Sequence, residues 1–262
     1  MGIKRIIDIT QLPSKYHNFI LTPTTDGVCD SVYLLDDKYV VKYFENSKNS
    51  LIDNEITLLN ILSSIRVPKV LDRFIINNKE AVVYTQINGK SKYNPSLKNI
   101  KEIGEFLKLM HSKTKNLSNN NIKIFSKNIV LDMIIRSKHE PLLKYFNEIE
   151  IELKDDGIIH GDLFVDNAKF LNNKLTGVYD FSDACVGDFK FDLAVVAISW
   201  CYDEVNLNYQ KLKTLLLSYK FQESYTEFKP YLQYALLYYA TRRYINNRDY
   251  QELIDKFKLL KL

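Results

Sequence analysis

Residues 158–167 read Ile158-Ile159-His160-Gly161-Asp162-Leu163-Phe164-Val165-Asp166-Asn167, two apolar positions followed by a polar loop. In this loop an Asp follows a His by two positions, and an Asn follows that Asp by five. The carboxylate of Asp162 can accept a hydroxyl proton, and the amide oxygen of Asn167 is a hard metal ligand. The alternative interpretation is that both residues only cap neighbouring helices, because short motifs recur by chance.

A second carboxylate, Asp180, ends the apolar run 175–179 and lies thirteen residues after Asn167. In phosphoryl transfer, Mg²⁺ is usually held by one or two such oxygen ligands together with the phosphates of the substrate. Asp180 is followed by Gly187-Asp188 and by Asp192-Leu193-Ala194, and this context favours phosphate chemistry over the capping interpretation.

Outside this segment, hydrophobic periodicity divides the chain at Asn88-Gly89. Before that point, two β-branched and aromatic hairpins turn at Asp36-Asp37 and at Asn77-Asn78, with one helical stripe between them. After it, helices are expected near 127–138, 141–154 and 204–260 and short strands near 157–159, 168–171 and 175–180, following a first helix from about 97. The pattern predicts an α+β fold with a small β-rich lobe, 1–88, and a larger helical lobe, 89–262.

Composition excludes several classes of protein. Of 262 residues, 46% are hydrophobic and 26% charged, which excludes bulk disorder. A net charge of +4 without a dense basic block disfavours a nucleic-acid binder. Three cysteines without a CxxC pair disfavour a disulfide framework or a zinc site and favour a reducing compartment. The first ten residues lack the apolar core of a leader, and the longest near-apolar stretch, 193–202, is too short for a membrane span, so we expect a cytoplasmic protein.

Residues 157–201 resemble the aminoglycoside phosphotransferase / choline kinase superfamily of small-molecule kinases. The resemblance is carried by His160-Gly161-Asp162 with Asn167, Asp180-Phe181-Ser182-Asp183, Gly187-Asp188 and Asp192-Leu193-Ala194. Within the superfamily, the homoserine kinase branch is most similar, at Gly161-Asp162-Leu163-Phe164, Asp180-Phe181, Ala184-Cys185 and Trp200-Cys201. The resemblance implies a protein-kinase-like fold whose residues 1–88 bind the nucleotide and whose residues 89–262 carry catalysis and the acceptor.

The resemblance also implies roles for the matched residues of the second lobe. Asp162 becomes the base that orients and deprotonates the acceptor hydroxyl, and His160 braces its loop. Asn167 and Asp180 hold Mg²⁺ on the phosphates of ATP, and Asp192 ties the loop to the following helix.

In the first lobe, Val40-Val41-Lys42 is similar to the kinase strand whose lysine contacts ATP phosphates. Glu55, thirteen residues later on the next helix, is positioned to pair with Lys42, although an exposed helix charge is the alternative. ATP therefore binds between the two lobes in this interpretation.

The phosphate loop has one glycine in place of a GxGxxG series. The resemblance implies that Gly27 makes the turn and that the Ser31 hydroxyl or a backbone amide reaches a phosphate, with a plain β-turn as the alternative. Thr85 and Ile87 belong to the stretch expected to bind adenine through its backbone.

The acceptor side is expected to favour an anionic group. Residues 195–262 carry ten Lys and Arg against seven Asp and Glu, a net of +3 that disfavours polycationic aminoglycosides. Arg242 and Arg243 cannot both point inward; either one suits a carboxylate, whereas a solvated helix face is the alternative. Clustered tyrosines after residue 200 are expected to pack in the core, with a choline-type cage as the alternative.

The sequence thus predicts an ATP-dependent, Mg²⁺-dependent kinase for a small hydroxyl compound. The segment between Asp180 and Asp192 lacks an activation loop and an Ala-Pro-Glu element, which disfavours a protein substrate. Homoserine or a related amino alcohol is the acceptor expected first; choline, ethanolamine, a sugar, an aminoglycoside and a nucleotide-binding pseudokinase are the alternatives. A nucleic-acid or membrane partner is not expected, and the chain is expected to be a monomer or a homodimer.

Overall fold

A computed structural model describes residues 5–24, 30–45, 47–118 and 123–260. It divides into two compact units, Met1–Asn88 and Gly89–Leu262. No helix in these ranges has the length and apolar character needed to cross a bilayer.

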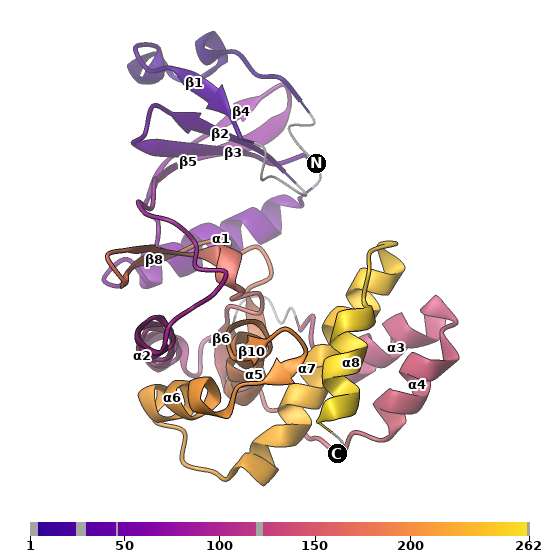
Figure 1. Ribbon diagram of the computed structural model, residues 1–262. Coiled ribbons are helices and arrows are strands. Elements are labelled where there is room, and N and C mark those ends of the chain that lie inside the picture. The colour runs from indigo at the N-terminus through magenta and orange to yellow at the C-terminus, as the bar shows by residue number, and fades with distance from the viewer. Residues whose placement is uncertain (1–4, 25–29, 46, 119–122, 261–262) are drawn as a thin grey trace. The chain divides into compact units, whose positions relative to one another are not determined.

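Unit 1 is built on a five-stranded antiparallel sheet with the order β1-β2-β3-β5-β4 (Figure 1). Its strands are β1 (Leu21–Pro23), β2 (Ser31–Leu35), β3 (Tyr39–Tyr43), β4 (Val70–Ile76) and β5 (Lys79–Thr85). Both predicted hairpins are confirmed, with Leu35 paired to Tyr39 and Ile76 paired to Lys79. The two turns fall where Asp36, Asn77 and Asn78 adopt the left-handed conformation that Asp and Asn tolerate best.

Successive side chains of the central strand β3 point to opposite faces of this sheet. One face packs on the N-terminal segment with the 3₁₀ turns η1 (Ile9–Gln11) and η2 (Ser14–Tyr16). Leu12 and Tyr16 belong there to one core cluster with Leu35, Val41 and Val83. The other face turns Lys42 toward α1 (Asn49–Ile61), the helix predicted between the two hairpins.

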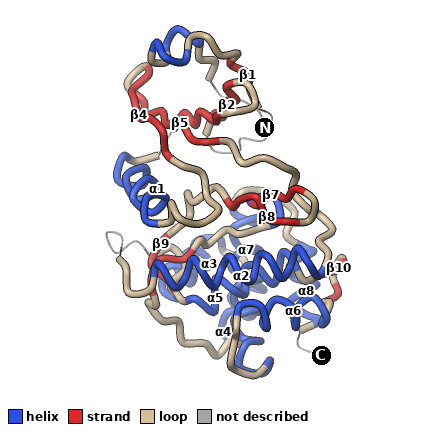
Figure 2. Tube along the Cα trace, turned by 90° about the vertical axis from the view of Figure 1, so that its left-hand side faces the viewer, coloured by secondary structure: helices blue, strands red, loops and turns tan. Residues whose placement is uncertain are grey.

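Unit 2 is mainly helical, and Figure 2 shows its helices packed side by side. They are α2 (Leu97–Thr114), α3 (Lys127–Ser137), α4 (Glu140–Asn147), α5 (Phe189–Trp200), α6 (Tyr209–Tyr219), α7 (Tyr225–Ile245) and α8 (Gln251–Leu259). The central helix is α5, which is apolar almost all round and packs against α2, α6 and α7. The expected core role of the tyrosines is confirmed, because Tyr234 and Tyr238 of α7 are buried.

Three two-stranded ribbons complete unit 2. They are β6 (Gly157–Ile159) with β9 (Cys185–Gly187), β7 (Ala168–Leu171) with β8 (Lys174–Val178), and β10 (Tyr202–Asp203) with β11 (Asn206–Leu207). The first two ribbons flank residues 160–167, which we call the His-Asp loop and which ends in the 3₁₀ turn η3 (Val165–Asn167).

Three predicted boundaries were wrong. The helix expected over 141–154 ends at Asn147, because Ile149, Ile151 and Leu153 alternate with exposed glutamates, a period of two that suits extended backbone and not a helix. The strand expected over 175–180 ends at Val178, because Asp180 has a φ of 64° and leaves extended geometry. The region expected to be helical over 204–260 starts with β11, and breaks at Lys220 and near Asn246 divide the rest into α6, α7 and α8.

Candidate active site

The His-Asp loop is held by hydrogen bonds to its backbone. Asp192 of α5 accepts the N–H of His160 at 2.9 Å on one carboxylate oxygen and the N–H of Gly161 at 2.9 Å on the other. Farther along, the Trp200 indole donates to the carbonyl of Leu163 at 2.9 Å. The loop therefore follows α5, a largely buried helix, and that helix fixes the geometry of the loop.

Gly161 is required where it lies. Its φ is +77°, which an L side chain rarely adopts, and an added Cβ would lie 2.6 Å from the Phe125 ring and 2.9 Å from the Asp183 carbonyl oxygen. The Tyr239 hydroxyl of α7 donates to its carbonyl. The tight backbone at Gly161 thus brings the segment after β8 and a face of α7 against the loop.

Asp192 is itself fully buried, and His111 of α2 supports it. The Nε2 of His111 lies 2.9 Å from Asp192 Oδ2, and its Nδ1 lies 2.7 Å from the Tyr219 hydroxyl. Burial alone raises the pKa of Asp192, but the hydrogen bonds from His111 and from Gly161 outweigh it and leave the pKa below its usual value. Asp192 is therefore ionised, and it ties the His-Asp loop to α2 and α5.

His160 lies inside unit 2, with no exposed surface. Its Nδ1 accepts the backbone N–H of Asp162 at 3.2 Å, so Nε2 carries the proton and donates to the carbonyl of Tyr179 at 3.2 Å. Burial is the main cause of its lowered pKa. A neutral His160 with both ring nitrogens engaged positions Asp162 through its backbone.

Asp162 is half-buried at the centre of the loop. Burial and the negative charge of Asp183 raise its pKa to about 8, against the opposing effects of the Arg242 charge and a Tyr239 hydrogen bond. A carboxylate whose pKa is close to neutrality is well matched to proton transfer.

Asn167 and Asp180 are brought to one end of the β7–β8 ribbon. Asn167 directly precedes β7 and accepts the backbone N–H of Tyr179, so Asp180 follows at the same end. The amide nitrogen of Asn167 donates to the carbonyl of Asp162 at 2.7 Å and to its Oδ2 at 3.3 Å. The amide oxygen of Asn167 consequently remains as an acceptor beside the two carboxylates.

This donor set fits Mg²⁺ better than a transition metal. It offers one amide oxygen and carboxylate oxygens, which hard cations prefer. Asp180 is exposed and adopts the left-handed conformation that Asp tolerates, which turns the chain just after β8. Within the part of the chain that the structure describes, no three His, Cys, Asp or Glu side chains form a closed metal cage. Further ligands must come from phosphates and water, as is usual for Mg²⁺.

In unit 1, the expected pairing of Lys42 is present. Its Nζ lies 3.3 Å from Glu55 Oε2 and 3.9 Å from Asp30 Oδ2, and all three side chains are at most 13% exposed. Glu55 also accepts the Tyr84 hydroxyl at 3.2 Å. Lys42 is thus a fixed positive charge on β3 between two carboxylates.

The remaining nucleotide residues are placed less directly. Gly27 lies outside the described residues. Ser31 is fully buried and donates its hydroxyl to Glu45 at 2.7 Å, so its expected phosphate contact stays a prediction that requires this bond to be exchanged. Thr85 and Ile87 are half-buried at and after the end of β5, where the Thr85 hydroxyl accepts the Lys69 N–H at 2.9 Å.

The two arginines of α7 point to different partners. The Arg242 guanidinium donates to the Asp183 carboxylate, beside the His-Asp loop, whereas Arg243 lies 4.0 Å from Glu252 of α8. The structure therefore brings Arg242, and not Arg243, to Asp162. Sequence reasoning gave no role to Asp183; its only signal was a second carboxylate three residues after Asp180.

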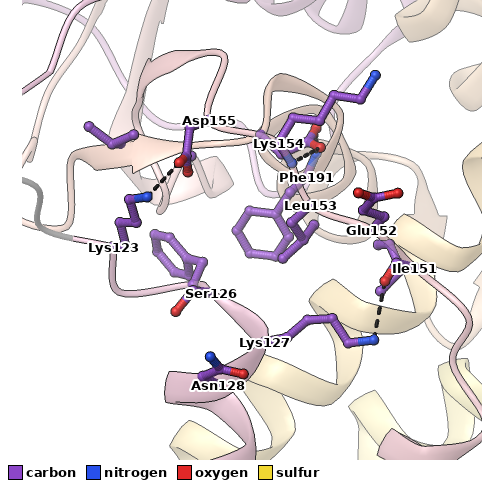
Figure 3. A pocket seen from close by; sticks show the side chains of 14 residues that line it. Lys123, Ser126, Lys127, Asn128, Ile151, Glu152, Leu153, Lys154, Asp155 and Phe191 are labelled. Atoms are coloured by element: carbon purple, nitrogen blue, oxygen red, sulfur yellow. Dashed lines mark hydrogen bonds and ion pairs between the residues drawn. The ribbon is translucent and has the colours of Figure 1, made fainter.

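A cavity of about 450 Å³ lies at the start of α3, and Figure 3 shows its lining. Lys123 and Asp155 pair across it at 2.5 Å, and Phe125 and Phe191 form its apolar wall. None of the site residues predicted from the sequence lines it, although Phe125 also packs on Gly161. The cavity is therefore a feature distinct from the Asp162 site.

Known proteins resemble this chain in sequence. A profile of the phosphotransferase enzyme family matches residues 20–213. The homoserine kinase of Bartonella tribocorum is 31% identical over 156 residues, 54% of this chain and 49% of that protein. The homoserine kinase of Methylobacillus flagellatus is 24% identical over 217 residues, 74% of this chain and 67% of that protein. The chain spans about half the length of the first of these relatives.

Solved structures resemble it in fold. The aminoglycoside phosphotransferase APH(2'')-IIIa, in its GDP and kanamycin complex, aligns with a TM-score of 0.69 at 15% identity, covering 97% of this chain and 95% of that one. A choline/ethanolamine kinase family protein from Mesorhizobium loti aligns with a TM-score of 0.64 at 13% identity, covering 97% and 91%. At these identities the likeness shows the fold alone, which is the predicted kinase-like fold with an antiparallel N-terminal sheet and a helical C-terminal unit.

Proposed function

This chain belongs to the phosphotransferase enzyme family, and on that basis we propose that it transfers the terminal phosphoryl group of ATP to a hydroxyl group of a small molecule. One observation carries the proposal: the Asn167 amide lies 3.3 Å from the Asp162 carboxylate, on a loop whose backbone is bound to α5. Asp180 lies at the end of the adjoining β7–β8 ribbon. Together the three residues supply a base, Asp162, and two oxygen ligands for a metal ion, on Asn167 and Asp180.

Asp162 acts as the base in this proposal. It accepts the proton of the acceptor hydroxyl as that oxygen bonds to the terminal phosphorus of ATP. The bond from this phosphorus to the bridging oxygen breaks, and the products are a phosphate ester, ADP and a proton on Asp162. The positive charge of Arg242 favours the ionised carboxylate that this step needs.

Asn167 and Asp180 hold Mg²⁺, which supplies positive charge to the phosphates of ATP. Lys42 contributes a second positive charge to these phosphates, and Glu55 keeps its side chain in place. His160 and Asp192 act as positioning residues, because they hold the loop backbone and not the reacting atoms.

The nucleotide contacts of unit 1 are assigned by the family resemblance. The backbone around Thr85 and Ile87 binds adenine, and the turn at Gly27, with Ser31, approaches the phosphates.

Homoserine is the acceptor that we propose first, since the curated relatives named above are homoserine kinases. The guanidinium of Arg242, beside the His-Asp loop, offers a partner for the carboxylate of homoserine. A choline-type aromatic cage is disfavoured, because Tyr238 and Tyr239 are only 3% and 5% exposed and pack edge to face against each other.

Calorimetry with ATP tests this proposal. ATP should bind in the presence of Mg²⁺. A chelator or the change Asp180→Ala should weaken ATP binding by about tenfold or more, since each removes the positive charge of Mg²⁺ from the phosphates. Asp132→Ala is the matched control, because Asp132 is an exposed carboxylate of α3 that pairs only with Arg136 one turn away. An ATP affinity that is unchanged by the chelator and by Asp180→Ala would reject the metal site. Absence of ATP binding would reject the proposed function.

A further inference from the structure

The Asp183–Arg242 ion pair lies beside the loop of the proposed base, and the proposed reaction gives no role to Asp183. Asp183 follows β8 and its carbonyl packs on Gly161, while Arg242 projects from α7 one turn after Tyr239. Their side chains are 19% and 37% exposed, so both retain access to a ligand. The pair therefore lies where an acceptor would reach Asp162.

Both charges lie beside Asp162. The carbonyl of Asp183 packs on Gly161, the residue before Asp162, and Arg242 follows Tyr239, whose hydroxyl donates to the carbonyl of Gly161, by one turn of α7. A ligand bound to Asp162 through its hydroxyl would thus be within reach of one positive and one negative side chain.

The fold has little need of this pair. Partly exposed ion pairs contribute little to stability, whereas Asp183 adds a third carboxylate to a region that already holds Asp162 and Asp180. Arg242 offsets the charge of Asp183 in the absence of a ligand, and a ligand with both charges can replace each partner without leaving a charge unpaired. A recognition role explains why two opposite charges are kept together here.

We propose that Asp183 and Arg242 together recognise an acceptor with two opposite charges near its hydroxyl group, an ammonium group on Asp183 and a carboxylate on Arg242. This inference rests on the proposed function, since it needs a hydroxyl acceptor at Asp162. The two side chains separate from each other and each pairs with the ligand, so that one ion pair is exchanged for two.

Ligands with one kind of charge are rejected by the same pair. An acceptor that carries only positive charge, such as choline, can bind Asp183 but brings its cation against Arg242. An acceptor that carries only a carboxylate can bind Arg242 but brings its anion against Asp183. Leaving one of two charged groups unpaired, or opposed by a like charge, is a strong source of discrimination.

Three compounds that share a three-carbon chain ending in a hydroxyl group test this inference. Homoserine carries both charges, 4-hydroxybutyrate lacks the ammonium group, and 3-aminopropan-1-ol lacks the carboxylate. Binding is measured by the rise in unfolding midpoint with each compound, and kcat/KM by coupled ADP release. The parent chain should prefer homoserine over each of the other two by about tenfold or more.

The variants should separate the two contacts. Asp183→Asn should remove most of the preference over 4-hydroxybutyrate, and Arg242→Gln most of the preference over 3-aminopropan-1-ol. Arg243→Gln, the adjacent arginine paired with Glu252, should change neither preference by more than about twofold. Retained binding of ATP with Mg²⁺ shows that each variant is folded.

Two outcomes would overturn the inference while leaving the proposed function intact. In the first, ATP binds but none of the three compounds binds or is phosphorylated. In the second, all three are used equally, or Arg243→Gln changes the preferences as much as Arg242→Gln does. Failure of the parent to bind ATP with Mg²⁺ would instead reject the proposed function.

Discussion

Asp183 and Asp192 lie nine residues apart in one segment, yet their surroundings differ in every respect. Asp192 has no exposed surface and accepts hydrogen bonds from His111 and from two backbone amides. Asp183 is 19% exposed and pairs with the guanidinium of Arg242. The oxygens of Asp192 are therefore all engaged by groups of the chain itself, whereas the partner of Asp183 is one that a ligand can replace.

This contrast separates two kinds of charged group in unit 2. Buried groups with several hydrogen bonds, Asp192, His111 and His160, fix the backbone of the His-Asp loop. Half-exposed groups, Asp162 and the Asp183–Arg242 pair, are presented by that backbone. Changes in the first set should therefore cost stability, and changes in the second should cost activity.

The largest effect is expected at Asp162. Asp162→Asn keeps the size of the side chain but removes the base, so kcat should fall about 10²–10⁴-fold in a coupled ADP-release assay. Burial and the charge of Asp183 raise the pKa of Asp162. At any pH above the ordinary pKa of about 3.8, ionisation of this carboxyl therefore opposes folding. The unfolding midpoint should consequently stay unchanged or rise. Asp166→Asn, an exposed carboxylate of the same loop, is the control, and a loss below about tenfold at Asp162 would remove it from the role of base.

The change Asp192→Asn should show the opposite pattern. The side-chain amide that replaces the carboxylate points its NH₂ group at a backbone N–H of the loop, so a buried hydrogen bond is lost. In addition, His111 loses its charged partner. Unfolding should become easier by about 3–5 kcal/mol, a fall of about 10 °C in midpoint. Asp132→Asn, at an exposed carboxylate paired with the exposed Arg136, should cost less than about 1 kcal/mol. Equal midpoints for the two variants would contradict the contrast between buried and exposed carboxylates.

A smaller effect is expected from His160 as the pH falls. Its pKa is lowered by burial, so the unfolded chain binds a proton below the ordinary value of about 6.5 while the folded chain does not. The free energy of unfolding should then decrease as pH falls below about 6.5, by at most about 1.4 kcal/mol per pH unit from this group. The lowered pKa of Asp192 adds a further loss only below about 3.8.

Urea unfolding at pH 8, 6.5 and 5 measures this dependence. In His160→Asn the side-chain oxygen can still accept the Asp162 N–H, but the titrating group is gone. The raised pKa of Asp162 acts in the opposite direction in parent and variant alike, because the folded chain keeps that proton below about pH 8 while the unfolded chain releases it. The effect of His160 is therefore the difference between the two proteins: from pH 8 to pH 5 the free energy of unfolding should change more favourably in the variant than in the parent. An unchanged slope would assign the pH dependence to other groups.

Local structure was predicted well wherever the pattern itself contains the cause. The hairpins about Asp36 and Asn77 follow from alternating strands and from turn residues that tolerate positive φ. The end of α4 was missed although the sequence carries a sign of it, because Ile149, Ile151 and Leu153 alternate with glutamates as in extended backbone. The hydrogen bond from the Lys154 N–H to the Asp188 carboxylate, by contrast, joins two segments and leaves no sign in the periodicity of either.

In the candidate site, too, features that lie in a short motif differ from features that depend on contacts between distant segments. The identities of Asp162, Asn167 and Asp180 could be predicted because their chemistry lies in short motifs with fixed spacing. The distinction between Arg242 and Arg243 could not, because two adjacent positions on a helix point in directions that only the packing of α7 distinguishes.

The sequence alone therefore determined the two hairpins of unit 1 and most helices of unit 2, and it proposed Asp162, Asn167 and Asp180 as site residues, because periodicity and motif spacing are properties of neighbouring residues. The tertiary structure determined which charges meet. His111 and Asp192 are 81 residues apart, and Arg242 and Asp183 are 59 residues apart. Such pairs form only when α2, α5 and α7 pack around one core, since burial makes the contact between distant segments favourable and the spacing along the chain does not encode it.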